Sequence, residues 1–162
     1  IAYLIGVDDL VLAAVLLLFF GLFDALYCEL ARLQNKASPK GMLLDATTDR
    51  MKEVILFIGI GFYLVHNNLE IFTVWAIAAI GGSLLVSYVK AKGETAVKDK
   101  NLSANQINRL FSNGIMRYEV RMFAIVLALL LNALSAFVVF IALSTWLSAT
   151  NRLFRISSKL ES

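Results

Sequence analysis

The sequence predicts an all-α fold of the polytopic membrane class, and two observations support this prediction. The chain of 162 residues is 59% hydrophobic and has a mean hydropathy of +0.75, whereas soluble domains are roughly 45–50% apolar. Its apolar residues form long continuous runs instead of alternating with polar ones, which indicates membrane-spanning helices. We therefore expect residues 1–162 to form a single transmembrane domain.

The apolar runs divide into five expected spans. A membrane-spanning helix needs about 20 apolar residues at a rise of ~1.5 Å per residue. The run from Met122 to Leu147 is too long for one such helix, so we divide it into two spans that meet in a turn. The expected spans cover residues 10–33, 41–65, 69–90, 115–132 and 135–154. Because Ile1 already lies in apolar sequence without the features of a signal peptide, a sixth span is expected to precede it.

The basic residues lie on one side of these spans. All 15 Lys and Arg residues fall within residues 32–52, 90–121 and 152–159, which five spans place at the same membrane face. Cytoplasmic connections carry an excess of Lys and Arg, so we expect this face to be cytoplasmic. The net charge of +3 follows from this asymmetry and indicates no nucleic-acid partner. Residues 93–113 are expected to form a cytoplasmic loop with a short helix.

Three aspartates lie where the first two expected spans reach this face. Asp24 is on the first helix, and Asp45 and Asp49 stand one turn apart on the second. Two consecutive antiparallel helices are expected to bring these carboxylates together. Clustered carboxylates in apolar surroundings need a cation between them. Because no histidine or cysteine cluster is nearby, the oxygen ligands favour Mg²⁺ or Mn²⁺, and such ions suggest chemistry on a phosphate or diphosphate.

Other interpretations of these acidic residues stay open on spacing alone. Acidic side chains near helix starts can complement the helix dipole, and Arg50 and Lys52 can pair with them. The carboxylates can also form an ion- or proton-coupled pathway. The sequence lacks the internal repeat and the interrupted helices that such carriers often show.

The spacing of these residues resembles the motif of the CDP-alcohol phosphatidyltransferase family. The family pattern is D-x-x-D-G-x-x-A-R, eight residues, then G-x-x-x-D-x-x-x-D; residues 24–49 read DALYCELAR, LQNKASPK and GMLLDATTD. Five of the seven positions after the leading aspartate match, with the eight-residue gap intact. The stretches SYVKAKGE, GIMRYEVR and TNRLFRISSKL are similar to basic segments of the family. The likeness therefore covers nearly the whole chain.

The resemblance implies a six-span, homodimeric enzyme of a prokaryotic cell membrane. Such an enzyme transfers a phosphatidyl-type group from a CDP-linked lipid to an alcohol and releases CMP, in membrane phospholipid biosynthesis. Asp24, Asp45 and Asp49 match the first, third and fourth family aspartates and would bind the metal. Asp49 would also be the general base that takes the proton of the acceptor hydroxyl.

The resemblance also implies binding positions for the two substrates. The positions expected on the nucleotide side are Ala31, Arg32, Ser38 and Gly41. Two of the arginines in the later basic segments lie four residues apart on one helix face, which suits a phosphate. The residues expected to bind an acceptor phosphate are Lys90, Lys92, Arg117, Arg121 and Arg152. This set resembles the family branch whose acceptor is a phosphorylated polyol, such as inositol phosphate or glycerol phosphate, although each residue alone also fits ordinary anchoring at the membrane face.

The sequence departs from the family pattern at two positions. Tyr27 replaces the second aspartate, and Cys28 replaces the glycine that follows it. A neutral phenol is a poor Mg²⁺ ligand, and Cys28 adds a side chain where the nucleotide should approach the backbone. Either another group completes the site, or the chain is a non-catalytic member of the fold that binds a lipid or a partner subunit.

With three of the four carboxylates present, the site is expected to hold one divalent ion tightly, between Asp24 and Asp45. A second ion is expected to bind only weakly beside Tyr27, because a carboxylate ligand is missing there. Loss of a ligand should lower the metal affinity by more than the roughly 10–100-fold that is typical when a ligand loses only its hydrogen-bond partner. Tyr27→Asp should restore the second ion where Cys28 leaves room for it. Anomalous scattering from Mn²⁺-soaked crystals measures both positions, and two fully occupied peaks in the unaltered chain would contradict this expectation.

Overall fold

The computed structural model describes residues 1–34, 38–98 and 118–161, and within these ranges the regular secondary structure is helical throughout. The predicted all-α class is confirmed. The elements in chain order are α1 (Ala2–Gly6), α2 (Leu10–Leu33), α3 (Pro39–His66), the 3₁₀ turn η1 (Glu70–Phe72), α4 (Thr73–Lys98), α6 (Tyr118–Leu130) and α7 (Leu134–Glu161).

The five expected spans correspond one to one to α2, α3, α4, α6 and α7. The largest differences are at the ends of α4 and α7, which continue to Lys98 and Glu161 instead of ending near residues 90 and 154. Residues 93–98 are therefore helical and not loop as expected, because Ala, Glu and Lys in this stretch favour helix beyond the apolar run. The rest of the segment 93–113, including the expected short helix, lies outside the described residues.

The helices have the length and the exposed apolar side chains of a membrane protein. Two of them, over Glu70–Ala96 and Leu134–Ser158, are long and apolar enough to cross a membrane, and Leu10–Asp24 is a shorter apolar helix. Large apolar side chains such as Phe19, Phe62 and Leu147 are more than half exposed. Such a surface is unfavourable in water and suits contact with lipid. The class is that of a helical membrane protein, and the number of spans beyond these two stays a prediction.

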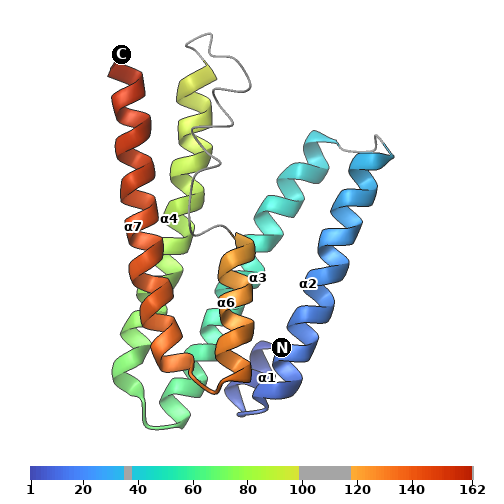
Figure 1. Ribbon diagram of the computed structural model, residues 1–162, viewed down its shortest axis with the longest axis vertical. Helices are drawn as coiled ribbons and strands as arrows, with labels where there is room; N and C mark the ends of the chain where they lie inside the picture. The colour runs from blue at the N-terminus through green and yellow to red at the C-terminus, as the bar shows by residue number, and fades with distance from the viewer. Residues whose placement is uncertain (35–37, 99–117, 162) are drawn as a thin grey trace.

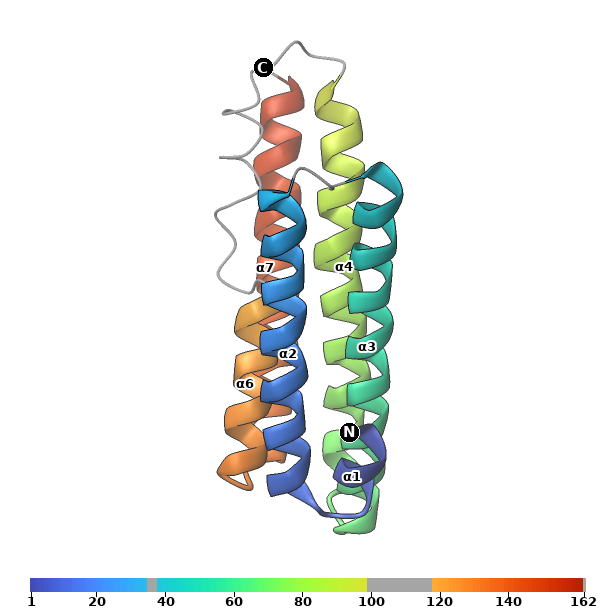
Figure 2. The same cartoon turned by 90° about the vertical axis from the view of Figure 1, so that its right-hand side faces the viewer.

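The helices form two arms that share one end of the molecule. In Figure 1, α4 and α7 lie side by side and run in the same direction, while α2 and α3 lean away from them and α6 lies between the two arms. The view turned by 90° shows α2 next to α6 and α3 next to α4 (Figure 2), and these pairs pack against each other. The end of α2 that contains Arg32 lies at the same end of the molecule as the ends of α4 and α7 that contain several Lys and Arg residues (Figure 1).

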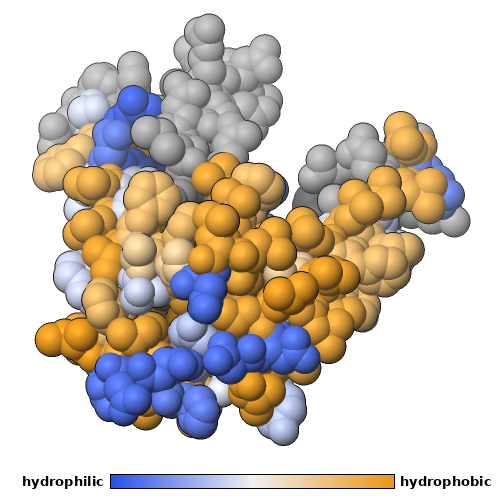
Figure 3. All heavy atoms as spheres, turned by 60° about the horizontal axis from the view of Figure 1, so that its bottom comes forward, coloured by the Kyte–Doolittle hydropathy of each residue, from blue (hydrophilic) through white to orange (hydrophobic). Residues whose placement is uncertain are grey.

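The opposite end is formed by the turns between the helices. Asp8, Asn68 and Asn132 adopt positive φ values of 69°, 56° and 49° in these turns, a conformation that Asp and Asn tolerate better than other side chains. The turn expected between the last two spans is therefore found at Asn132, whose Oδ1 accepts a hydrogen bond of 2.8 Å from the Tyr63 hydroxyl. Figure 3 shows hydrophilic side chains gathered across this end. The connections over residues 7–9, 67–69 and 131–133 contain no Lys or Arg, as expected.

The packing of α4 against α7 depends on a glycine. A Cβ atom at Gly82 would lie 3.0 Å from Thr145 Cβ and 3.0 Å from Trp146 Cδ1, and Thr145 is fully buried. The indole Nε1 of Trp146 donates a hydrogen bond of 3.0 Å to the backbone oxygen of Ala78. Small residues allow helix backbones to approach this closely in membrane proteins.

We predict that Gly82→Ala destabilises the protein by about 1–3 kcal/mol, because overpacking forces neighbours out of their places. Gly81→Ala is the matched control, since its Cβ would meet only Trp146 Cζ2 at an ordinary 3.8 Å. Thermal unfolding of both variants in detergent measures the difference. Equal unfolding midpoints would show that Thr145 and Trp146 move aside without cost.

Candidate functional site

The start of α3 determines where two of the three aspartates lie. Ser38 caps this helix, because its Oγ accepts a hydrogen bond of 3.0 Å from the backbone N–H of Gly41. Pro39 occupies the first helical turn, where its missing N–H is not needed. With the helix begun here, Asp45 and Asp49 stand one turn apart and project from the same side of α3.

The structure brings these two carboxylates to Asp24 on α2. One carboxylate oxygen from each of Asp24, Asp45 and Asp49 lies within 4.8 Å of the others. Asp24 and Asp49 are partly buried, and Asp45 is exposed. Three carboxylates this close repel one another unless a cation lies beside them.

Lys52 supplies a cation to this cluster. Its Nζ lies 2.9 Å from Asp24 Oδ2 and 3.4 Å from Asp49 Oδ1, so it joins α2 to α3. Of the two basic residues considered as ion-pair partners of the aspartates, Lys52 has this role. The Lys52 side chain is 47% exposed, and ion pairs open to solvent contribute only about 0–1 kcal/mol. The ammonium group therefore shows that a cation is accepted beside these carboxylates, and its weak ion pairs do not prevent another cation from binding there.

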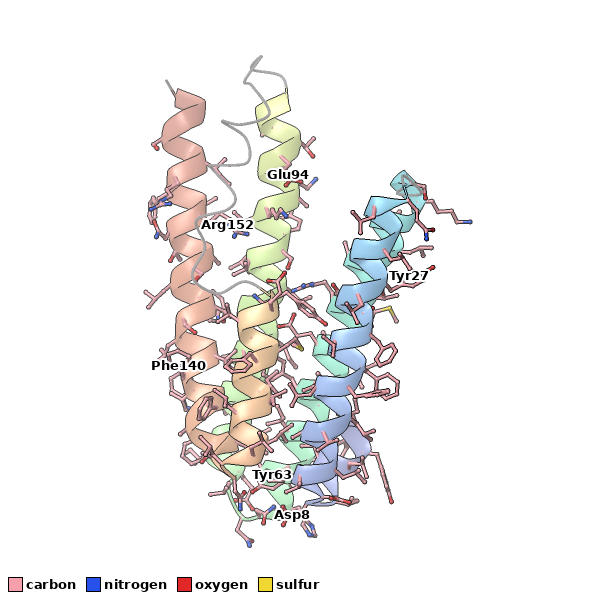
Figure 4. All side chains as sticks on the ribbon, turned by 45° about the vertical axis from the view of Figure 1, so that its right-hand side comes forward. Asp8, Tyr27, Tyr63, Glu94, Phe140 and Arg152 are labelled. Carbon is pink, nitrogen blue, oxygen red and sulfur yellow. The ribbon has the colours of Figure 1, made fainter. Side chains whose placement is uncertain are left out.

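The donor set fits a hard divalent ion. Asp24, Asp45 and Asp49 offer only oxygen, the ligand that Mg²⁺ and Mn²⁺ prefer, and a cationic group already lies among them. Tyr27, which follows Asp24 by one turn, is 75% exposed and lies near the upper end of α2 (Figure 4). The side chains of Cys28, Ala31 and Arg32 lie outside the described part of the structure.

A buried charge network lies one turn beyond Asp49. Glu53, 1% exposed, accepts hydrogen bonds from Nε and Nη2 of Arg121 on α6, the latter at 3.1 Å. It also accepts one of 2.7 Å from Arg50 Nη1. The guanidinium of Arg50 lies over the Tyr118 ring, 4.7 Å from its centre. Sequence reasoning missed Glu53, although an acidic residue at the start of an apolar run is a signal for such a partner.

The expected acceptor residues come from three helices. Arg121 on α6 is buried with its guanidinium bound to Glu53. Arg152 on α7 is 9% exposed and donates a hydrogen bond of 3.0 Å to the backbone oxygen of Val86 on α4. Arg117 lies outside the described residues.

The two lysines of the acceptor set lie on α4 and are exposed. Lys90 Nζ is 3.9 Å from Glu94 Oε1, and Lys92 Nζ lies 6.0 Å from the centre of the Tyr88 ring. Figure 4 shows Arg152 and Glu94 on the arm across from Tyr27. These basic side chains of α4 and α7 therefore belong to the other arm of the molecule from the one that carries Tyr27.

Comparison with known proteins extends over almost the whole chain. The family model for CDP-alcohol phosphatidyltransferase matches residues 1–154. The archaetidylinositol phosphate synthase of Pyrococcus horikoshii is 28% identical over 161 residues, which cover 99% of this chain and 77% of that protein. The phosphatidylinositol phosphate synthase of Corynebacterium glutamicum is 35% identical over 95 residues, which cover 57% of this chain and 43% of that protein. The chain thus spans most of the first relative and less than half of the second.

We predict that Arg121→Met lowers the free energy of unfolding by about 3–5 kcal/mol, because breaking a buried ion pair leaves an uncompensated charge. A double variant, Glu53→Met with Arg121→Met, should recover much of this loss. Arg155→Met on the exposed side of α7 is the control and should stay within about 0.5 kcal/mol of the unaltered chain. Thermal unfolding checks all three variants, and a midpoint for Arg121→Met equal to that of Arg155→Met would exclude a structural role for the pair.

Proposed function

The chain belongs to the CDP-alcohol phosphatidyltransferase family, and on this premise we propose that it transfers a phosphatidyl-type group from a CDP-linked lipid to a phosphorylated polyol. The membership confirms the resemblance found in the motif and the class of enzyme that it implied. The observation that carries the proposal is the meeting of Asp24 with Asp45 and Asp49 across two helices, at positions that match the family motif.

The proposed reaction is a substitution at phosphorus. The acceptor hydroxyl oxygen forms a bond to the phosphorus that carries the lipid, the bond from this phosphorus to the CMP oxygen breaks, and CMP leaves. Asp49 is proposed to accept the hydroxyl proton, and Asp24 and Asp45, with Asp49, to hold a divalent Mg²⁺ or Mn²⁺. When bound, the ion supplies positive charge to the donor diphosphate. The partly buried position of Asp49 supports its role, because a base shielded from water acts on the substrate and not on solvent.

The nucleotide is proposed to lie over the start of α3 and the last turns of α2. Ser38 and Gly41 begin α3, directly before the turn that carries Asp45. Ala31 and Arg32 follow Asp24 on α2 by two turns. This arrangement supports a nucleotide that continues from the diphosphate at the aspartates toward the end of the molecule where α2 ends and α3 starts.

The acceptor is proposed to be a phosphorylated polyol because the similar proteins are named as inositol phosphate lipid synthases. Lys90, Lys92, Arg117, Arg121 and Arg152 are the proposed phosphate-binding residues. Glu53 holds the Arg121 guanidinium next to the helix that carries Asp49. We also propose that the site faces the cytoplasm of a prokaryotic cell, that the enzyme is a homodimer, and that residues 1–162 form one transmembrane domain.

A second candidate function is that of a non-catalytic member of the family that binds a CDP-linked lipid or a partner subunit. Tyr27 favours it, because the exposed phenol adds no carboxylate to the site. The two candidates differ in whether the purified chain releases CMP.

We predict that Asp49→Asn lowers CMP release by at least about 100-fold, as expected for loss of a general base. The assay contains CDP-linked lipid, Mn²⁺ and labelled inositol phosphate or glycerol phosphate. Asp8→Asn is the matched control, because Asp8 lies in a turn at the opposite end of the molecule, at a φ of 69° that asparagine also adopts (Figure 4).

Three other outcomes would each contradict part of this proposal. Failure of the unaltered chain to release CMP with any acceptor, while a Tyr27→Asp/Cys28→Gly variant does so, would identify a non-catalytic member. Equal rates for Asp49→Asn and the unaltered chain would remove Asp49 from the mechanism. Ion movement across sealed vesicles without CMP formation would favour a carrier.

A further inference from the structure

Lys52 lies within the carboxylate cluster. It follows Asp49 by three residues on α3, and its side chain reaches across to Asp24 on α2. Neither family resemblance nor motif spacing assigned it a role in the reaction. Its ammonium nitrogen donates to one oxygen of Asp24 and one oxygen of Asp49.

The charge of the cluster changes once Lys52 is included. Counted by themselves, the three carboxylates and the Lys52 ammonium sum to a charge of minus two, which one divalent cation neutralises. Two divalent cations beside the same groups would leave a net charge of plus two. Excess charge of this size is costly in a partly buried site, where interactions are less screened than in water. The family pattern has a fourth carboxylate, and here that position is Tyr27.

We propose that the Lys52 ammonium takes the place of a second divalent cation, so that the site holds one metal ion together with one lysine. The proposal rests on the proposed function. It makes Lys52 a residue that binds beside the donor diphosphate and lowers the metal requirement of the site. The missing carboxylate at Tyr27 and the positive charge of Lys52 act in the same direction, because both make a second divalent cation less favourable.

A role only in holding the fold together does not account for this arrangement. The side chains of Lys52 and Asp24 are 47% and 39% exposed, so their pairing adds little stability. The charges that hold α3 to α6 are instead those of Glu53 and Arg121, at 2% and 1% exposure. Lys52 thus lies where its charge reaches the ligands while its side chain stays open to solvent.

The test is a titration of the purified full chain with Mn²⁺, without substrate and at low ionic strength, with free Mn²⁺ measured by electron paramagnetic resonance. The unaltered chain should bind one Mn²⁺. Lys52→Met should bind Mn²⁺ at least about tenfold more tightly, because a unit charge ~4 Å from a divalent ion repels it this strongly even at the dielectric constant of water. Tyr27→Asp combined with Lys52→Met should bind two ions.

Two controls separate this effect from general electrostatics and from misfolding. Lys40→Met removes an exposed lysine from the start of the same helix and should change the affinity by no more than about twofold, since charges in solvent are screened. Lys52→Arg keeps the charge and should stay within about threefold of the unaltered chain. A lysine that only supports the fold would have the opposite effect, because its removal would loosen the cluster and weaken Mn²⁺ binding.

The outcomes distinguish the inference from the proposed function. If the unaltered chain binds Mn²⁺ and Lys52→Met binds it equally or more weakly, Lys52 does not take the place of a second divalent cation. The proposed function stands in that case. If the unaltered chain binds two ions of similar affinity, the inference is also wrong. If no variant binds Mn²⁺, the metal-dependent function itself fails, and the inference fails with it.

Discussion

Repulsion among three carboxylates is the constraint on which the arrangement of α2 and α3 depends. Asp24, Asp45 and Asp49 come within 4.8 Å of one another, and their charges favour separation of the two helices unless a cation lies between them. Each helix is held from its other side, α2 by α6 and α3 by α4. The meeting of α2 with α3 near the aspartates is therefore a polar contact, in which Lys52 bonds to Asp24. Such a contact can accept another cation without disturbing the apolar packing behind it.

Two ion pairs near the aspartates differ in their exposure to solvent. Glu53 and Arg121 are buried, and removal of either leaves the other without compensation, so this pair holds α6 to α3 firmly. Lys52 and Asp24 are open to solvent and can exchange partners. The buried pair lies one turn from Asp49 and fixes that part of α3, while the Lys52–Asp24 pair beside Asp49 stays open to solvent. This division fits the proposed function, in which the aspartates exchange cations and substrate while the helices behind them stay in place.

Much of the fold and of the candidate site followed from the sequence. The five helices were predicted because an apolar run of about the length of a membrane span indicates a helix. The position of the turn at Asn132 followed from the length of the run on either side. The meeting of Asp24 with Asp45 and Asp49 was expected because consecutive helices joined by a short connection are antiparallel, and helical spacing puts residues four apart on one side.

Other features depend on tertiary packing, which the sequence pattern does not contain. Glu53 and Arg121 are 68 residues apart, and their pairing depends on how α6 is rotated against α3. Spacing from Arg117 suggested a shared phosphate-binding face for Arg121, and that spacing carries no sign that the packing of α6 also buries the guanidinium against Glu53. The end of α4 was misjudged because hydropathy marks where the apolar run ends, whereas helix propensity carries the helix on to Lys98.

The proposed function depends on one cation site that is built from both α2 and α3. The most direct test is the Mn²⁺ dissociation constant of two separate variants, Asp24→Asn on α2 and Asp45→Asn on α3, measured with the folded full chain. We expect each substitution to weaken binding by more than about tenfold, because each removes a charged ligand from the same ion. If Asp24→Asn leaves the dissociation constant unchanged while Asp45→Asn raises it, the ion is held by α3 alone, and the account of a shared site is wrong.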